Sequence, residues 1–160
     1  MKKRIIIFLD IDGVMIVGWK KTKMFPWGFQ EPFDKGCVEV LNSIHEIMPV
    51  EIVISSDWRD HYSIPTLQKI FDEFGVKPKI TDVTPNSKKY VMDDLEGGRS
   101  DEINTYIGQH KDEILAWVSV DDLKMYDLEH FVECTKWTEG IKQTGIKEKI
   151  VNELKQQING

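Results

Sequence analysis

The chain has 160 residues, 41% of them hydrophobic and 30% charged, which is typical of a globular domain with its own core. The net charge of -6 argues against general affinity for nucleic acid, but it leaves room for a local basic patch. Cys37 and Cys134 lie far apart without C-x-x-C spacing, so they predict buried thiols rather than a zinc site or a disulfide. The first apolar run ends at Asp10, too short for a signal peptide or a membrane span, so we expect a cytoplasmic protein.

Strands and helices are predicted to alternate along the chain. Apolar runs predict buried strands at 4–9, 51–54 and 114–120, and 130–135 is predicted to be an edge strand. A further strand is predicted at 76–83, where Pro78 weakens the pattern. Apolar residues at helical spacing predict helices at 38–48, 64–74, 100–110 and 146–158. The third helix is expected to begin at Ser100 or Asp101 as its N-cap. This alternation predicts one α/β domain over 1–160 with a doubly wound, mostly parallel sheet.

Residues 14–35 separate the first strand from the first helix, and we expect them to form a short flap. Gly18 and the lysine-rich segment 20–23 are predicted to form the turn of a hairpin. With Trp19 and Trp27, these lysines would suit a single nucleic-acid strand, since bases stack on aromatic rings. The alternative is a solvated hairpin with its aromatic rings packed beneath it, and the acidic net charge favours this alternative.

Acidic and hydroxyl side chains directly follow three of the predicted buried strands. They are Asp10 and Asp12, which Gly13 follows, then Ser55 and Ser56, and finally Asp121 and Asp122. A D-x-D-G motif alone is often only a turn, but its position directly after a buried strand favours a functional site. In open α/β sheets, ligands bind in the crevice outside the carboxyl ends of the strands. We therefore expect these side chains to meet at one edge of the sheet.

This set of side chains suits phosphoryl transfer through an aspartyl-phosphate. Asp10 would attack phosphorus, and Asp12 would act first as general acid and then as general base. A bound Mg²⁺ ion would offset the repulsion between the attacking carboxylate and the phosphate. A serine hydroxyl, backbone N–H groups and a cation from Arg99 or a nearby lysine would hold the phosphoryl oxygens.

The motifs resemble those of the haloacid dehalogenase (HAD) superfamily of phosphohydrolases. The resemblance rests on the segments 8–14, 54–55 and 118–122, which follow the order of the family's first, second and fourth motifs. It implies a Rossmann-like fold, Mg²⁺ dependence, Asp10 as nucleophile and Asp12 as acid and base. It also implies metal ligation by Asp10, by the backbone carbonyl of Asp12 and by Asp122, with Asp121 in a supporting role.

Arg99 stands where the HAD family has the lysine of its third motif. Arginine can hold a phosphoryl group as well as lysine can, and Lys88 or Lys89 is the alternative. The segments 54–59 and 97–103 resemble the HAD domains associated with nucleic-acid repair, including polynucleotide phosphatases.

The second motif offers more than one group for binding phosphate. Ser55 ends the apolar run and is the first candidate, with Ser56 next to it. Gly13, Ser56 and Arg59 are predicted to contact the substrate. For Arg59, an ion pair with a nearby acid is an equally good interpretation, since arginine suits both roles.

No large cap domain is expected, because only the flap separates the first strand from the next helix. An open site would suit a large phosphorylated substrate, such as a nucleic-acid end or a phosphoprotein, or an oligomer in which a neighbour covers the site. We predict a Mg²⁺-dependent phosphatase of phosphate monoesters, with nucleic-acid ends as a candidate substrate. The alternatives are a phosphatase of small metabolites or nucleotides, a phosphotransferase, and a phosphate-binding module without turnover.

Overall fold

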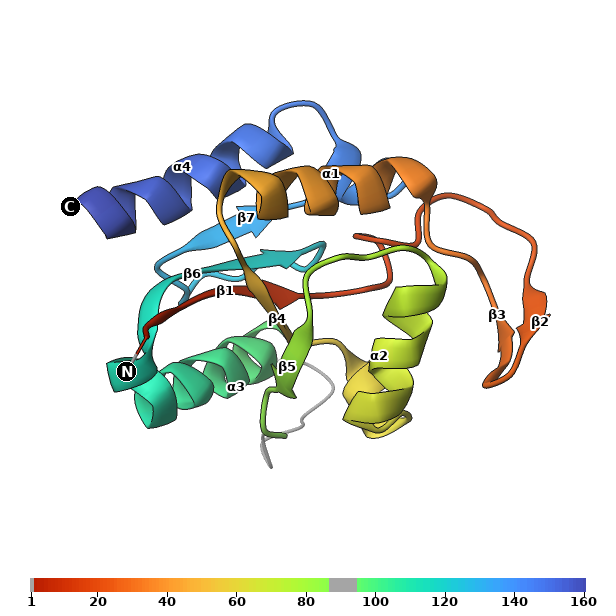
Figure 1. Cartoon of the computed structure of the whole chain (residues 1–160), viewed down its shortest axis with the longest axis horizontal. Coiled ribbons are helices and arrows are strands. Elements are labelled where there is room, and N and C mark those ends of the chain that lie inside the picture. The colour runs from red at the N-terminus through yellow and green to blue at the C-terminus, as the bar shows by residue number, and fades with distance from the viewer. Residues whose placement is uncertain (1, 87–94) are drawn as a thin grey trace.

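The computed structural model describes residues 2–86 and 95–160 and is built around a parallel five-stranded sheet with the order β5-β4-β1-β6-β7 (Figure 1). These strands are β1 (Arg4–Leu9), β4 (Glu51–Ile54), β5 (Ile80–Val83), β6 (Ile114–Asp121) and β7 (Phe131–Glu133). The most apolar strand, β1, lies at the centre, because it is buried on both faces. The predicted α/β fold with a mostly parallel sheet is confirmed.

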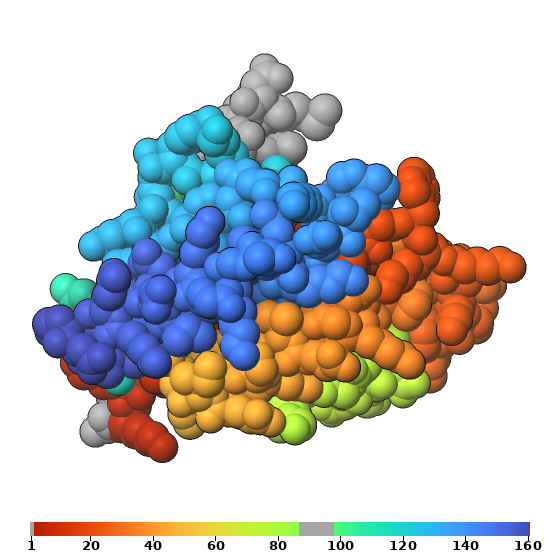
Figure 2. All heavy atoms as spheres, turned by 90° about the horizontal axis from the view of Figure 1, so that it is seen from above, coloured from red at the N-terminus to blue at the C-terminus, as the bar shows by residue number. Residues whose placement is uncertain are grey.

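Helices cover both faces of this sheet. They are α1 (Lys35–Ile47), α2 (Ile64–Glu73), α3 (Leu95–His110) and α4 (Ile146–Asn159), with the short 3₁₀ helices η1 (Asp57–Asp60), η2 (Lys111–Glu113) and η3 (Gly140–Lys142). Helices α1 and α4 lie side by side over one face, as Figure 2 shows from above, and α3 lies on the opposite face. Among the described residues, no helix is long and apolar enough to span a membrane.

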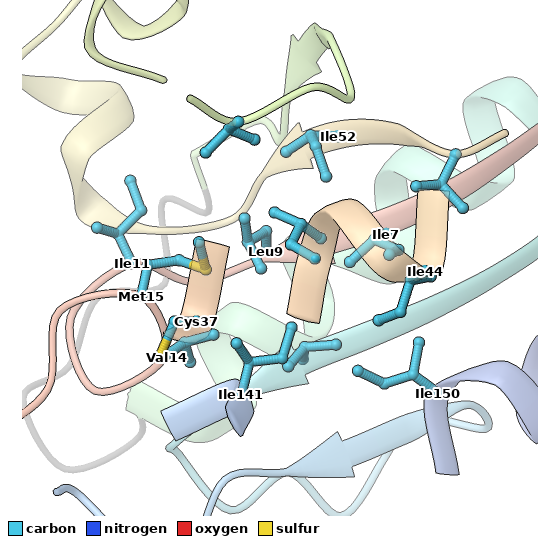
Figure 3. Packing of buried hydrophobic residues seen from close by; sticks show 14 of the residues in the cluster. Ile7, Leu9, Ile11, Val14, Met15, Cys37, Ile44, Ile52, Ile141 and Ile150 are labelled. Carbon is cyan, nitrogen blue, oxygen red and sulfur yellow. The ribbon is translucent and has the colours of Figure 1, made fainter. Parts of the chain in front are cut away.

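Side chains of β1 alternate between two hydrophobic clusters, as the period of two in a strand requires. Ile7 and Leu9 pack with apolar residues of α1 and α4 (Figure 3). Ile6 and Phe8 point to the other face and pack with Tyr106 of α3 and its neighbours. Both free cysteines are buried, as expected. The central strand is thereby held from both sides, which fixes the position of the residues that follow it.

The segment between β1 and α1 contains a small hairpin of β2 (Lys23–Phe25) and β3 (Gly28–Gln30). The turn predicted around Gly18 is wrong: the chain reverses at Pro26 and Trp27, with Gly28 at φ 119° after them. Trp27 stacks on Phe25, which matches the interpretation of a hairpin with packed aromatic rings. Trp19, in contrast, is 91% exposed. The described chain has no large cap in this region.

Asp34 connects this segment to the helical layer. It is the N-cap of α1, where its side chain accepts a hydrogen bond from the backbone N–H of Cys37. Its Oδ2 also accepts hydrogen bonds at 2.9 Å from Lys20 and from Lys142 of η3. The cap therefore ties the beginning of α1 to two segments that are distant in sequence.

Three predicted boundaries differ from the structure by three residues or more. Helix α1 begins at Lys35 rather than at Val38. Helix α3 already includes Leu95, so Ser100 and Asp101 lie inside the helix and neither is its N-cap. The strand predicted over 76–83 begins only at Ile80, since Pro78 has no N–H to donate to a neighbouring strand.

Candidate active site

The predicted site residues follow three neighbouring parallel strands at the same edge of the sheet. Leu9, the last residue of β1, pairs with Ile54 of β4 and with Val120 of β6. Asp10 therefore lies between the ends of two strands, and its backbone N–H donates to the carbonyl of Val120 at 3.1 Å. The N–H of Ser55 donates to the carbonyl of Leu9 at 3.2 Å. The sheet register thus brings together residues that are far apart in the chain.

Three carboxylates meet at this edge. Asp10 and Asp121 are buried, at 4% and 0% exposure, whereas Asp122 is exposed. One oxygen from each of the three lies within 4.8 Å of the others. Oxygen donors at this spacing suit a hard divalent cation such as Mg²⁺. The donor set therefore fits the metal that the sequence resemblance implies.

Gly13 makes room for the exposed member of this cluster. A Cβ built on Gly13 would lie 2.2 Å from Oδ2 and 2.7 Å from Cγ of Asp122. Gly13 also has a φ of 81°, which disfavours other residues. We predicted Gly13 as a contact for substrate, and the structure places it against a candidate metal ligand.

Arg99 of α3 reaches into the acidic cluster. Its Nη1 lies 3.0 Å from Oδ2 of Asp121 and 3.5 Å from Oδ1 of Asp10. Its Nη2 lies 3.4 Å from Oδ1 of Asp57 in η1. The alternatives Lys88 and Lys89 lie outside the described residues.

The cluster carries more negative charge than this arginine balances. Burial raises the pKa of Asp10 well above its usual range, the charge of Asp121 raises it further, and Arg99 opposes both effects. Burial likewise raises the pKa of Asp121, against the opposing charge of Arg99. Burial alone would lower the pKa of Arg99, but its two acidic neighbours raise it above the ordinary value, so it stays charged. A further cation would favour the ionised form of Asp10 that a nucleophile requires.

A pocket of about 230 Å³ opens above these groups. It is lined by Asp10, Asp12, Ser56, Asp57, Arg99, Asp122 and Leu123. A larger hollow of about 750 Å³ lies near Lys2, Pro49 and Leu115, and none of the predicted site residues lines it. The smaller pocket therefore carries the candidate chemistry.

The two serines after β4 differ in what they contact. Ser56 lines the pocket, and its Oγ accepts a hydrogen bond from the N–H of Trp58 as the N-cap of η1. Ser55 is fully buried, and its Oγ has no hydrogen-bond partner among the described residues. A buried hydroxyl without a partner is costly, so a ligand that accepts this proton would stabilise the site. Both serines remain candidates for binding phosphoryl oxygens.

Arg59 lies in a buried ion pair and does not line the pocket. Its side chain is 2% exposed, and its Nη2 lies 2.7 Å from Oε2 of Glu102 in α3, which is 1% exposed. Its Nη1 donates to the backbone carbonyls of Ser55 and Ser56. These contacts match the ion-pair interpretation of Arg59 and leave it out of the pocket lining, and its contact with substrate stays a prediction.

Trp58 contacts the acid that the sequence reasoning assigned to proton transfer. Its indole Nε1 donates a hydrogen bond to Oδ2 of Asp12 at 3.0 Å. Asp57 and Trp58 were not among the predicted site residues. Their position directly after the second strand, at the edge that bears the acids, is the signal that could have indicated them.

Comparison with known proteins supports the resemblance drawn from the motifs. Residues 6–146 match the family described as "HAD domain in Swiss Army Knife RNA repair proteins". No curated protein sequence matches the chain. A crystal structure of 3-deoxy-D-manno-octulosonate 8-phosphate phosphatase from Moraxella catarrhalis, with magnesium, phosphate and KDO bound, is similar with a TM-score of 0.47 and 14% identity. That similarity covers 97% of this chain and 89% of the other.

Proposed function

Because the chain belongs to the family of HAD domains in Swiss Army Knife RNA repair proteins and is thus a HAD phosphohydrolase, we propose that it cleaves phosphate monoesters through a phosphorylated Asp10. The observation that carries this proposal is the position of Asp10 beside Arg99 and Asp122 in one pocket, with the buried Asp121 in contact with the same arginine. This arrangement supplies a nucleophile, a fixed cation and oxygen donors for a metal at the same edge of the sheet.

Asp10, Asp122 and the backbone carbonyl of Asp12 would hold Mg²⁺, with Asp121 supporting them. When bound, the ion would neutralise charge on the phosphate and on the attacking carboxylate. Burial raises the pKa of Asp10 and of Asp121, which disfavours their ionised forms. A bound cation would favour the ionised forms, and this supports the proposal of a metal at this edge.

The remaining steps of the proposed reaction are carried out by side chains of the protein. Asp10 forms a bond to phosphorus as the bond from phosphorus to the leaving oxygen breaks, and Asp12 gives its proton to that oxygen. Asp12 then takes a proton from water, which attacks the aspartyl-phosphate and releases inorganic phosphate. Arg99 and a hydroxyl of Ser55 or Ser56 stabilise the phosphoryl oxygens as charge develops on them.

We further propose a nucleic-acid end as the substrate, ahead of a small metabolite. The support is a pair of exposed rings, Trp19 at 91% and Trp137 at 56% exposure, whose centroids lie 6.4 Å apart. Their segments are joined by a hydrogen bond from the N–H of Gly18 to the carbonyl of Trp137. Exposed aromatic faces stack with bases, and the exposed Lys21 and Lys136 suit backbone phosphates. Both segments follow strands at the edge that bears the pocket.

The experiment that tests the chemistry is hydrolysis of 4-nitrophenyl phosphate with Mg²⁺ and with EDTA. We expect turnover that requires the metal and is lost in Asp10→Asn. Asp112→Asn removes one exposed carboxylate in η2, away from the strands' carboxyl ends, and should behave as the unchanged chain. Turnover that survives in Asp10→Asn would refute the nucleophile assignment.

A substrate screen tests the second part of the proposal. It compares kcat/KM for 3′-phosphorylated oligonucleotides, mononucleotides and sugar phosphates. We expect the oligonucleotides to be preferred, and this preference to fall when Trp19 and Trp137 are both replaced by alanine. A preference for sugar phosphates would favour the small-metabolite alternative instead.

A further inference from the structure

Three consecutive side chains of η1 each contact a different residue at or beside the active site. Asp57 pairs with Arg99, and Arg59 pairs with Glu102. Between them, Trp58 donates its indole N–H to Asp12. The short helix after β4 therefore connects the groups that follow β1 with the helix that carries the arginine. Of the three contacts, the one made by Trp58 reaches the residue proposed to transfer the proton.

Trp58 is itself held in place by its surroundings. Its backbone N–H donates to Oγ of Ser56 at 3.2 Å. Its ring packs against Tyr62 at 5.5 Å and against Phe33 at 6.2 Å between centroids. An indole has few rotatable bonds and a single donor, so a packed tryptophan offers a hydrogen bond in one fixed direction.

Asp12 needs such a partner more than its neighbours do. Its side chain is exposed, whereas Asp10 and Asp121 are buried and restrained by the cluster around Arg99. Among the described residues, Trp58 makes the one hydrogen bond to the Asp12 carboxylate. The bond occupies Oδ2, so Oδ1 is left to exchange a proton with the leaving oxygen and with water. A general acid must lie within hydrogen-bond reach of the leaving oxygen. The rate of proton transfer from Asp12 therefore depends on the rotamer of its side chain.

We propose that Trp58 is a positioning residue that holds the Asp12 carboxylate in the orientation required for proton transfer. This inference rests on the proposed role of Asp12 as acid and base. It assigns a function to a residue outside the nucleophile, the acids and the arginine. It also explains why an exposed carboxylate at the mouth of an uncovered pocket can keep one orientation.

The test is Trp58→Phe, which keeps an aromatic ring and removes the N–H donor. The matched control is Trp27→Phe, because Trp27 also donates its indole N–H, to Gln30 in the hairpin, and is not part of the pocket. The readout is kcat/KM for phenyl phosphate and for 4-nitrophenyl phosphate, since kcat/KM reports the step that expels the leaving group. Phenolate is the poorer leaving group and depends more on the proton from Asp12. Thermal unfolding of both variants checks that packing is retained.

We expect Trp58→Phe to lose about tenfold in kcat/KM with phenyl phosphate and much less with 4-nitrophenyl phosphate, since general acid catalysis as a whole contributes 10² or more. Trp27→Phe should change neither value. An equal loss with both substrates, a gain, or no loss would overturn the positioning role. Asp12→Asn separates this failure from failure of the proposed function. If Asp12→Asn is inactive on phenyl phosphate while Trp58→Phe is unaffected, only the inference about Trp58 fails. If Asp12→Asn stays fully active, the assignment of Asp12 as acid and base is wrong.

Discussion

Replacing Gly13 by alanine should weaken metal binding by displacing Asp122. The added Cβ would lie 2.2 Å from Oδ2 of Asp122, and ordinary contact begins at 3.4 Å, so the carboxylate must move by about 1 Å. A misplacement of this size in a catalytic site can cost about 100-fold in rate. Alanine at a φ of 81° also destabilises the fold by about 1–2 kcal/mol.

Gly75 provides a matched control for the backbone strain. Its φ of 79° is close to that of Gly13, but a Cβ there would meet no atom within 4 Å. Urea unfolding should therefore show a similar loss of about 1–2 kcal/mol in Gly75→Ala and Gly13→Ala. Only Gly13→Ala should need at least about tenfold more Mg²⁺ for half-maximal hydrolysis of 4-nitrophenyl phosphate, consistent with a displaced ligand. The same Mg²⁺ requirement in both variants would refute the reasoning.

Two further predictions concern buried charge. Burial alone would raise the pKa of Asp34, but the hydrogen bonds from Lys20 and Lys142 hold it below the usual range. This stabilisation is complete above the unfolded pKa of about 4 and is lost as the pH falls towards the folded pKa. Asp34→Asn should therefore cost about 1 kcal/mol in urea unfolding at pH 7 and progressively less below pH 4, and a difference independent of pH would contradict this. Arg59→Met leaves the buried Glu102 without its guanidinium, so unfolding free energy should fall by about 3–5 kcal/mol and partly recover when Glu102→Leu is added; a loss under 1 kcal/mol would argue against a buried ion pair.

The sheet and the acids at its edge could be predicted because their sequence signals are local. The run 5–9 is apolar throughout, which marks a strand buried on both faces, and the structure places it at the centre of the sheet. Asp10 and Asp121 directly follow or end such runs, so parallel pairing alone brings them to one edge. The period of apolar residues likewise located α2 and α4 to within a residue or two.

The contacts of individual side chains could not be predicted, because they depend on packing between distant segments. Nothing near Trp58 in sequence shows that Asp12 lies within reach of its indole. The ion pair of Arg59 could not be predicted because its partner Glu102 lies on α3, far from it in the chain. Gly13 signalled a turn, but its closeness to Asp122 depends on the pairing of β1 with β6.

The position of β1 in the sheet also has a consequence for how the protein is made. Its partner β4 follows soon in the chain, whereas its other partner, β6, pairs Ile114 with Arg4 and is synthesised much later. Until β6 is synthesised, the edge of β1 that pairs with it has no native partner. Unpaired strand edges of this kind pair readily with other chains. Asp121 ends β6 and Asp122 directly follows it, so a ribosome-bound chain has its complete acidic cluster only after β6 pairs with β1. The growing chain therefore has an edge prone to aggregation until the same strand pairing that completes the acidic cluster has formed.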